Sequence, residues 1–231
     1  FSEIIFYFYS SNSEGIKSEL GYKPYDYDWR NLTWPEYYVW DDYQYEFIRN
    51  LNQVSPKYKI NKIGPISLQA RYVNHNEFPE NSIALFDISP CRISKYISLG
   101  NTHEYYTPKY TIKFISDILE ECEKRNIKLI LKRKRHADNI HPLYENYLSS
   151  LKGNKNIHIL SPEINAISLV KSTKLSISMP FTSCAIIGLF YSRPSCYYDP
   201  IGEIYADDRA SHGIEIVQTP QSLGSWLDSF I

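Results

Sequence analysis

Residues 176–191 read Ser176-Ile-Ser-Met-Pro-Phe-Thr-Ser-Cys-Ala-Ile-Ile-Gly-Leu-Phe-Tyr191, and residues 195–200 read Ser195-Cys-Tyr-Tyr-Asp-Pro200. The first stretch predicts an apolar strand, a loop of four residues and then a helix of small residues. The second predicts another short strand. Hydroxyl side chains at a helix start can cap free backbone N–H groups, and the same N–H groups can hold a phosphate. Ordinary capping and phosphate binding therefore both fit this pattern.

From Ser82 onward, short apolar runs alternate regularly with amphipathic segments. We expect strands over 83–88, 127–131, 157–160, 175–178, 196–198 and 214–217, and helices over 110–125, 142–151, 164–171, 183–191 and 221–230. Ser161-Pro-Glu163 has a proline where the third of these helices is expected to begin. This alternation predicts an α/β fold, a Rossmann-type domain with a parallel sheet and helices on both faces. Ligands of such sheets bind outside the carboxyl ends of the strands.

The first 79 residues predict part of a second, N-terminal α/β domain. A strand is expected over 3–10, a polar stretch rich in aromatic residues runs to about Pro35, and a helix over 39–51 and a strand over 58–66 follow. Residues 74–81 are polar and are the best candidate for a linker. We therefore expect a partial N-terminal domain over 1–79 and a C-terminal, Rossmann-like domain over 80–231.

Composition and charge restrict the classes of function. The chain has 231 residues, of which 43% are hydrophobic, and a formal net charge of -1. That charge gives no general attraction to nucleic acid or to an anionic membrane. No apolar run reaches the roughly 18 residues that span a bilayer, and the first residues do not form a signal peptide. We therefore expect a cytoplasmic protein with no nucleic-acid partner, at most peripherally associated with the inner face of the membrane.

A run of basic residues, Lys132-Arg-Lys-Arg-His136, comes directly after an expected strand. Guanidinium and ammonium groups at that place would bind a phosphate or a carboxylate. A solvated charge run in a loop is the other interpretation. His136 and His141 have no carboxylate at metal-ligand spacing, so no metal site is predicted.

Two carboxylates also follow expected strands. Asp87 lies in Phe86-Asp-Ile-Ser-Pro90, where it could act as a base or a nucleophile or orient a substrate hydroxyl. It could equally be a turn carboxylate that caps Ser89 and nearby N–H groups. Asp199 could touch a ribose or simply turn the chain.

The motif Pro180-Phe-Thr-Ser183, followed by Tyr197-Tyr-Asp-Pro200, resembles the surface-polysaccharide biosynthesis proteins that are named for their PFTS motif. The likeness extends to residues 86–90 and to the basic stretch 132–135, and more thinly to the N-terminal third. That family resembles GT-B glycosyltransferases. More distantly, it resembles the transferases that use CMP-activated ulosonic acids such as Kdo or sialic acid. In those enzymes a basic segment with a histidine and a Ser/Thr loop hold the CMP phosphate without a metal.

Carried over to this chain, the resemblance implies two sets of donor-binding residues. The loop role falls on Thr182 and Ser183 within the motif, and the basic role falls on one or more residues of 132–136. The nucleotide-binding candidates are Lys132, Arg133, Arg135, His136, Pro180, Phe181, Thr182, Ser183 and Asp199. The chain departs from the pattern because no His-Pro pair ends the basic strand; His141-Pro142 would be its displaced counterpart.

The resemblance also implies a second Rossmann-like domain, for which residues 1–79 are too few. We therefore expect the chain to be truncated and its opening strand to belong to a larger acceptor-side domain. The catalytic candidates are Asp87 and, from the N-terminal domain, Glu14.

The function that we expect is a GT-B-like glycosyltransferase of bacterial surface-polysaccharide biosynthesis. It would need no cofactor or metal and would transfer Kdo or another ulosonic acid from a CMP donor to a glycan or lipid-linked glycan. One alternative is a UDP-hexose transferase, or a nucleotide-sugar epimerase-like relative, with the same cleft. Another is a non-catalytic module, derived from a transferase, that binds a glycan or a partner.

Overall fold

The computed structural model describes residues 4–11, 16–22, 29, 31, 33–51, 58–69, 78–79, 81–90, 94, 107–134 and 140–231. Glu14, Arg135, His136 and most of the expected linker lie outside these ranges. The chain divides into an N-terminal unit, Phe1–Arg71 with Ile204–Gly213, and a C-terminal unit, Tyr72–Glu203 with Ile214–Ile231. The domain boundary that we expect between residues 79 and 80 stays a prediction.

The C-terminal unit is built on a six-stranded parallel sheet. Its strands are β4 (Ser82–Phe86), β5 (Lys128–Lys132), β6 (Ile157–Leu160), β7 (Leu175–Ser178), β8 (Ser195–Tyr198) and β9 (Glu215–Val217). Their order is β6-β5-β4-β7-β8-β9, which is the strand order of a Rossmann fold. Every residue of β4 and β7 is buried, as expected for central parallel strands covered on both faces.

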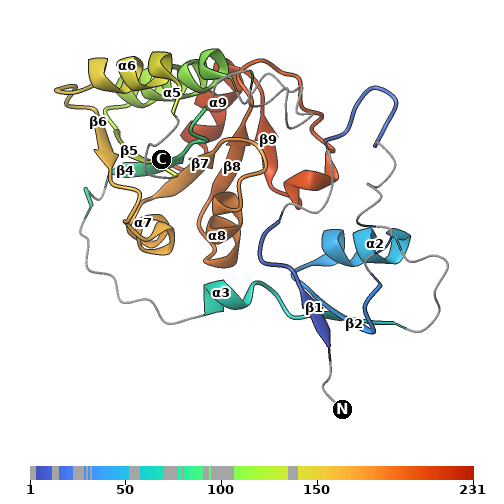
Figure 1. Ribbon diagram of the computed structural model, residues 1–231. Helices are drawn as coiled ribbons and strands as arrows, with labels where there is room; N and C mark the ends of the chain where they lie inside the picture. The colour runs from blue at the N-terminus through green and yellow to red at the C-terminus, as the bar shows by residue number, and fades with distance from the viewer. Residues whose placement is uncertain are drawn as a thin grey trace. The chain divides into compact units, whose positions relative to one another are not determined.

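Helices cover both faces of this sheet, with α5, α6 and α9 on one face and α7 and α8 on the other (Figure 1). Their bounds are α5 Pro108–Lys124, α6 Pro142–Ser150, α7 Ala166–Ser172, α8 Cys184–Phe190 and α9 Pro220–Asp228. The longest, α5, begins where the Thr107 side chain accepts a hydrogen bond from the Tyr110 N–H. It buries an apolar stripe that includes Phe114, Ile115 and Ile118. None of the described helices is both long and apolar enough to span a bilayer.

The expected start of the third helix of this unit is wrong. Ser161-Pro-Glu163 lies in a turn, and α7 begins only at Ala166. The Asn165 side chain accepts hydrogen bonds from the N–H groups of Ile167 and Ser168. This cap, which satisfies two otherwise free donors, sets the beginning of the helix.

The N-terminal unit contains a three-stranded parallel sheet, ordered β1-β2-β3. Its elements are β1 (Ile5–Tyr7), β2 (Glu36–Val39), α2 (Asp42–Leu51), β3 (Lys59–Lys62) and α3 (Ile66–Gln69). The strand β2 was not expected, and the helix expected from residue 39 begins three residues later. The Asp41 side chain accepts from the Gln44 N–H, while the Gln44 side chain accepts from the Trp40 N–H. This reciprocal cap separates the strand from the helix.

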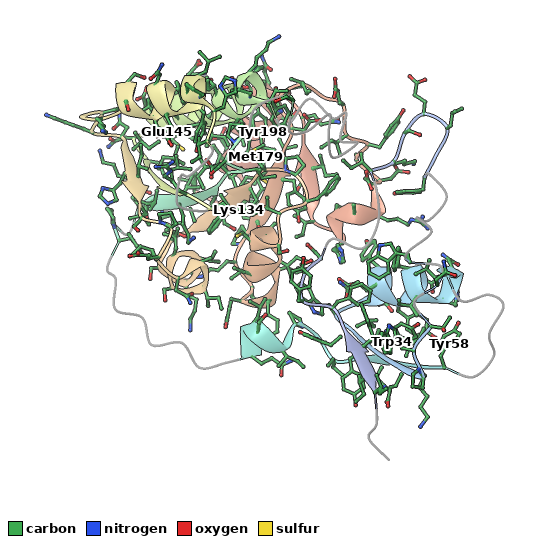
Figure 2. The ribbon with its side chains drawn as sticks, viewed as in Figure 1. Trp34, Tyr58, Lys134, Glu145, Met179 and Tyr198 are labelled. Atoms are coloured by element: carbon green, nitrogen blue, oxygen red, sulfur yellow. The ribbon has the colours of Figure 1, made fainter. Side chains whose placement is uncertain are left out.

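Aromatic side chains form much of the core of the N-terminal unit. The rings of Phe8 and Trp29 stack with centroids 5.8 Å apart, and Phe47 meets Trp29 edge-on at 5.1 Å. Figure 2 shows Trp34 and Tyr58 at the three-stranded sheet. The tyrosine and tryptophan content of this part of the chain therefore contributes to packing.

The segment Ile204–Gly213 is held in the N-terminal unit by polar contacts. Asp208 accepts hydrogen bonds from the Lys17 N–H and the Tyr22 hydroxyl. The two ring nitrogens of His212 lie 2.5 Å from Asp41 Oδ2 and 2.8 Å from the Ser11 carbonyl oxygen. Both ring nitrogens are therefore engaged within the unit.

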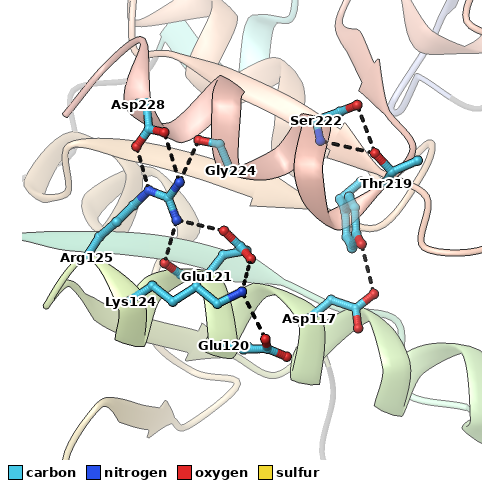
Figure 3. Close-up of polar contacts among 10 residues, drawn as sticks. Asp117, Glu120, Glu121, Lys124, Arg125, Thr219, Ser222, Gly224 and Asp228 are labelled. Atoms are coloured by element: carbon cyan, nitrogen blue, oxygen red, sulfur yellow. Dashed lines mark hydrogen bonds and ion pairs between the residues drawn. The ribbon is translucent and has the colours of Figure 1, made fainter.

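In the C-terminal unit, Arg125 joins the end of α5 to α9 (Figure 3). Its guanidinium donates to both carboxylate oxygens of Asp228, at 2.7 and 3.0 Å, and to the Gly224 carbonyl at 3.0 Å. It also donates to Glu121 Oε2 at 2.7 Å. The Glu121 side chain is only 8% exposed, so it depends on such partners for its charge.

We expect the substitution Arg125→Ala to lower the free energy of unfolding by about 1–3 kcal/mol, because it leaves buried acceptors without a donor. The control is Glu120→Ala, which removes a 68% exposed carboxylate that forms an ion pair with Lys124. That change should stay within about 0.5 kcal/mol of the parent. Urea denaturation followed by circular dichroism measures both, and equal effects of the two substitutions would contradict the assignment.

Candidate functional site

The candidate site lies where the order of the strands reverses, between the carboxyl ends of β4 and β7. The register pairs Phe86 of β4 with Ser178 of β7 on one side and with Lys132 of β5 on the other. The loops that leave these three strands therefore start side by side. In Rossmann-type sheets this is the place where ligands bind.

Buried polar atoms without hydrogen-bond partners gather on these loops. Among the described residues of the C-terminal unit, five such side-chain atoms are found: Asp87 Oδ1, Ser89 Oγ, Arg133 Nε, Ser178 Oγ and Thr182 Oγ1. All five belong to the ends of β4, β5 and β7 or to the residues just after them. Buried polar groups in folded proteins are nearly always paired, so an unpaired group needs an explanation. A concentration at the ligand edge of the sheet indicates a binding site for a polar ligand.

Asp87 is the central carboxylate of this site and is only 2% exposed. The Tyr144 hydroxyl of α6 donates a hydrogen bond to Asp87 Oδ2. Burial raises the pKa of Asp87 to about 7, and this effect is partly opposed by Arg133, by the residue's own backbone N–H, and by Lys134 and Lys132. A carboxyl group that titrates near neutral pH at a strand end is suited to proton transfer.

The loop after β7 carries backbone strain. Phe181 has a φ of 62°, in the left-handed region that bulky residues rarely adopt. Such a conformation costs about 1–3 kcal/mol and persists where the surrounding structure imposes it. Tyr197 of β8 supplies part of that support, because its hydroxyl donates to the Thr182 carbonyl at 3.1 Å and its ring meets Phe181 edge-on at 5.7 Å. Pro180, between Met179 and Phe181, is buried.

The structure places Thr182 and Ser183 at the start of α8. Ser183 precedes the first helical residue and makes no side-chain cap, while the Thr182 N–H donates to the Met179 carbonyl within the turn. The Thr182 hydroxyl, not its amide, is therefore the group that is left for a ligand. Gly188 lets α8 lie close to β8, since a Cβ there would be 2.6 Å from Ser195 Cβ.

The basic residues after β5 are partly engaged by the protein. Lys132 Nζ donates to the Pro162 carbonyl at 3.1 Å, and the Arg133 guanidinium forms an ion pair with Glu145 of α6. Lys134 is exposed. Arg135 and His136 lie outside the described residues, so their expected role stays a prediction.

Other predicted site residues have structural partners. His141, in the expected displaced counterpart of the His-Pro pair of the basic segment, caps α6 by accepting from the Leu143 N–H at 3.2 Å. Asp199 is fully buried and accepts from the Tyr110 hydroxyl and from the Ile201 N–H. Glu14 lies outside the described residues. Roles for Asp199 and Glu14 in binding or catalysis stay predictions.

Two contacts of the site could not be read from the sequence. Tyr144 and Glu145 are consecutive residues of α6, and they reach Asp87 and Arg133 respectively. No motif marks either residue. No group of three His, Cys, Asp or Glu side chains that could hold a metal ion occurs within the described ranges, and the absence of a metal requirement stays a prediction.

The raised pKa of Asp87 leads to a pH-dependent prediction. The folded state holds this proton more tightly than the unfolded chain, where the pKa is about 3.8. The resulting stabilisation is complete below about pH 4 and is lost as the pH rises through about 7. Asp87→Asn has no such group, so its stability relative to the parent should grow by about 2–3 kcal/mol between pH 5 and pH 8. Denaturant unfolding at the two pH values measures this gap, and a gap independent of pH would contradict it.

Solved structures include proteins that are similar to this chain. The UDP-GlcNAc 2-epimerase of Methanocaldococcus jannaschii, in complex with UDP-GlcNAc and UDP, matches 80% of this chain and 52% of its own, at 14% identity and a TM-score of 0.50. TarM matches 98% of this chain and 43% of its own, at 14% identity and a TM-score of 0.49. UGT71G1 of Medicago truncatula, complexed with UDP-glucose, matches 87% of this chain and 46% of its own, at 12% identity and a TM-score of 0.46. The chain thus spans about half the length of these proteins, and at such identities the likeness to the epimerase concerns the fold alone.

The fold class expected from the sequence is confirmed: a GT-B-like, Rossmann-type α/β domain with a parallel sheet and helices on both faces, plus part of a second α/β domain. Comparison with curated proteins gives no match. The family model of the polysaccharide biosynthesis PFTS motif proteins matches residues 1–227. Its motif is Pro180-Phe-Thr-Ser183, the strained loop that borders the unpaired buried groups of the site. This chain belongs to the family of polysaccharide biosynthesis PFTS motif proteins.

Proposed function

We propose that this chain is the donor-binding part of a glycosyltransferase that builds a surface polysaccharide from a nucleotide-sugar. The observation that carries the proposal is the group of unpaired buried polar atoms at the ends of β4, β5 and β7. Membership of a polysaccharide biosynthesis family supports the same reaction class. The acceptor is a glycan or a lipid-linked glycan, and the enzyme works in the cytoplasm, at most peripherally bound to the membrane.

The chemistry of the site suits the phosphate of such a donor. The hydroxyls of Ser89, Ser178 and Thr182 are buried donors that phosphate oxygens would satisfy. Lys132 and Arg133 supply positive charge from the next strand end. When a glycosyl group leaves its nucleotide, negative charge grows on the phosphate, and fixed donors and cations in a water-poor site stabilise that charge without a metal.

For the donor we propose a CMP-activated ulosonic acid. Such a donor carries a phosphate and a carboxylate on the same carbon, so two anionic groups would lie near the basic loop of β5. The alternative is a UDP-hexose, and the structurally similar epimerase is a protein bound to UDP and UDP-GlcNAc. Within the site, Asp87 is the proposed reactive carboxyl; its burial favours acid–base work over nucleophilic attack, because a nucleophile must be ionised.

The test is nucleotide binding by the chain, measured by titration calorimetry with CMP, UDP and GDP. We expect a clear preference for a pyrimidine nucleotide, with CMP bound more tightly than UDP. Tighter binding of UDP would move the proposal to a UDP-hexose donor. No binding of any of the three would overturn the donor site and would favour a non-catalytic module.

The substitution Thr182→Val should weaken nucleotide binding about 10- to 100-fold, the effect of losing one hydrogen bond to a charged group. It should not lower stability, because the hydroxyl has no partner in the described part of the protein. The control is Thr173→Val, since the buried Thr173 hydroxyl donates to the Leu169 carbonyl at 3.0 Å. That variant should lose about 1 kcal/mol of stability and keep its affinity. Unchanged nucleotide affinity in Thr182→Val would remove the loop from the binding site.

A further inference from the structure

The two oxygens of the Asp87 carboxyl group have different surroundings. Oδ2 accepts the hydrogen bond of the Tyr144 hydroxyl, whereas Oδ1 is buried and has no partner among the described residues. Ser178 and Thr182, whose hydroxyls are also unpaired, follow on the neighbouring strand and its loop. All three residues lie at the carboxyl ends of the paired strands β4 and β7 or just after them, so their unpaired atoms lie at the same edge of the sheet.

An anionic ligand restricts the protonation state of that oxygen. An ionised Oδ1 beside a phosphate oxygen would place two negative charges together in a site with little water, which is strongly unfavourable. A protonated Oδ1 instead donates a short, charge-assisted hydrogen bond to the anion. A buried carboxylic acid that stays neutral in order to donate a hydrogen bond is a known device of enzyme sites.

We propose that Asp87 binds the donor phosphate as a neutral acid through Oδ1, with Tyr144 as the residue that positions its carboxyl group, so that donor binding takes up one proton. This inference rests on the proposed function and adds to it a proton-linked step and a positioning residue. No bond other than hydrogen bonds forms or breaks in this step, and the proton comes from the solvent.

The groups that face Asp87 come from three elements. Lys132, Arg133 and Lys134 at the end of β5 favour its ionised form, but burial outweighs them and raises its pKa to about 7. The thiol of Cys184 at the start of α8 is neutral because burial raises its pKa to about 11. A phosphate that arrives would offset the three cations and add negative charge. Both effects raise the pKa of Asp87 further.

Tyr144 holds the geometry from α6. Its side chain is fully buried, and the next residue, Glu145, holds Arg133 by an ion pair. One turn of this helix thus orients both the acid and a cation of the site. Because the Tyr144 hydroxyl hydrogen-bonds Oδ2, it leaves Oδ1 for the ligand.

The experiment is titration calorimetry with CMP and UDP at pH 8, in buffers of different ionisation enthalpy. The slope of the observed enthalpy against the buffer enthalpy gives the number of protons taken up. Since the pKa of Asp87 is about 7 in the free protein and the complex holds the neutral acid, we expect an uptake of about 0.9 proton at pH 8. The affinity of the parent should accordingly fall about eightfold per pH unit around pH 8.

Three variants separate this inference from a general structural effect. Asp87→Asn keeps a hydrogen-bond donor at this place, so it should bind nucleotide with no proton uptake and with an affinity independent of pH. Tyr144→Phe removes the donor to Oδ2, which raises the pKa of Asp87 in the free protein and moves the uptake to higher pH. Tyr147→Phe is the matched control on the same helix. Burial and the charge of Asp117 raise the pKa of Tyr147, and Asp87 is not among these causes, so removing the Tyr147 hydroxyl should leave the proton uptake unchanged.

The outcomes distinguish the two proposals. Nucleotide binding by the parent without proton uptake, or with an uptake that persists in Asp87→Asn, would overturn the neutral acid and leave the donor site in place. An unchanged pH profile in Tyr144→Phe would overturn the positioning role. Absence of binding by any nucleotide would overturn the proposed function and this inference together.

Discussion

The pairing of β4 with β7 is the constraint on which the site depends. The two strands lie side by side at the centre of the sheet, all their residues are buried, and their register brings Phe86 next to Ser178. Parallel pairing makes both strands end at the same edge, so the Asp87 loop and the PFTS loop start as neighbours. A shift of one residue in this register would turn every following side chain to the other face of the sheet.

The site costs stability that the rest of the unit must offset. An unpaired buried hydroxyl or carboxyl oxygen costs about 1–3 kcal/mol, and the left-handed backbone of Phe181 adds a cost of similar size. Elsewhere in the described part of the unit, side chains cap the first N–H groups of helices such as α5 and α9, and Arg125 links α5 to α9 by hydrogen bonds. A concentration of unpaired buried groups at one edge is typical of a binding site carried by a rigid scaffold.

Asp87 joins the fold to the proposed chemistry. The same burial that gives a central parallel strand its stability also removes water from the residue just after it, and so raises its pKa. The basic loop of β5 opposes that shift without cancelling it. A phosphate donor would act on this balance directly, since it interacts with the cations and with the acid at once.

Sequence reasoning was strongest from Ser82 onward, because buried parallel strands are continuous apolar runs whose ends are marked by polar residues. The strands, the Rossmann-type α/β fold class and the positions of Asp87 and Thr182 at strand ends all followed from that local pattern, whereas the GT-B-like assignment followed from the resemblance to the PFTS-motif family. It failed for β2, a partly exposed strand of tyrosines without a clear alternation, and for α7, where the Asn165 side chain decides the helix start. Only the tertiary structure decided that Tyr144 meets Asp87, 57 residues away, and that Ile204–Gly213 packs with the N-terminal unit. The physical reason is that a residue's own sequence neighbourhood reflects its burial and backbone conformation, whereas its partners across the fold depend on how whole elements pack.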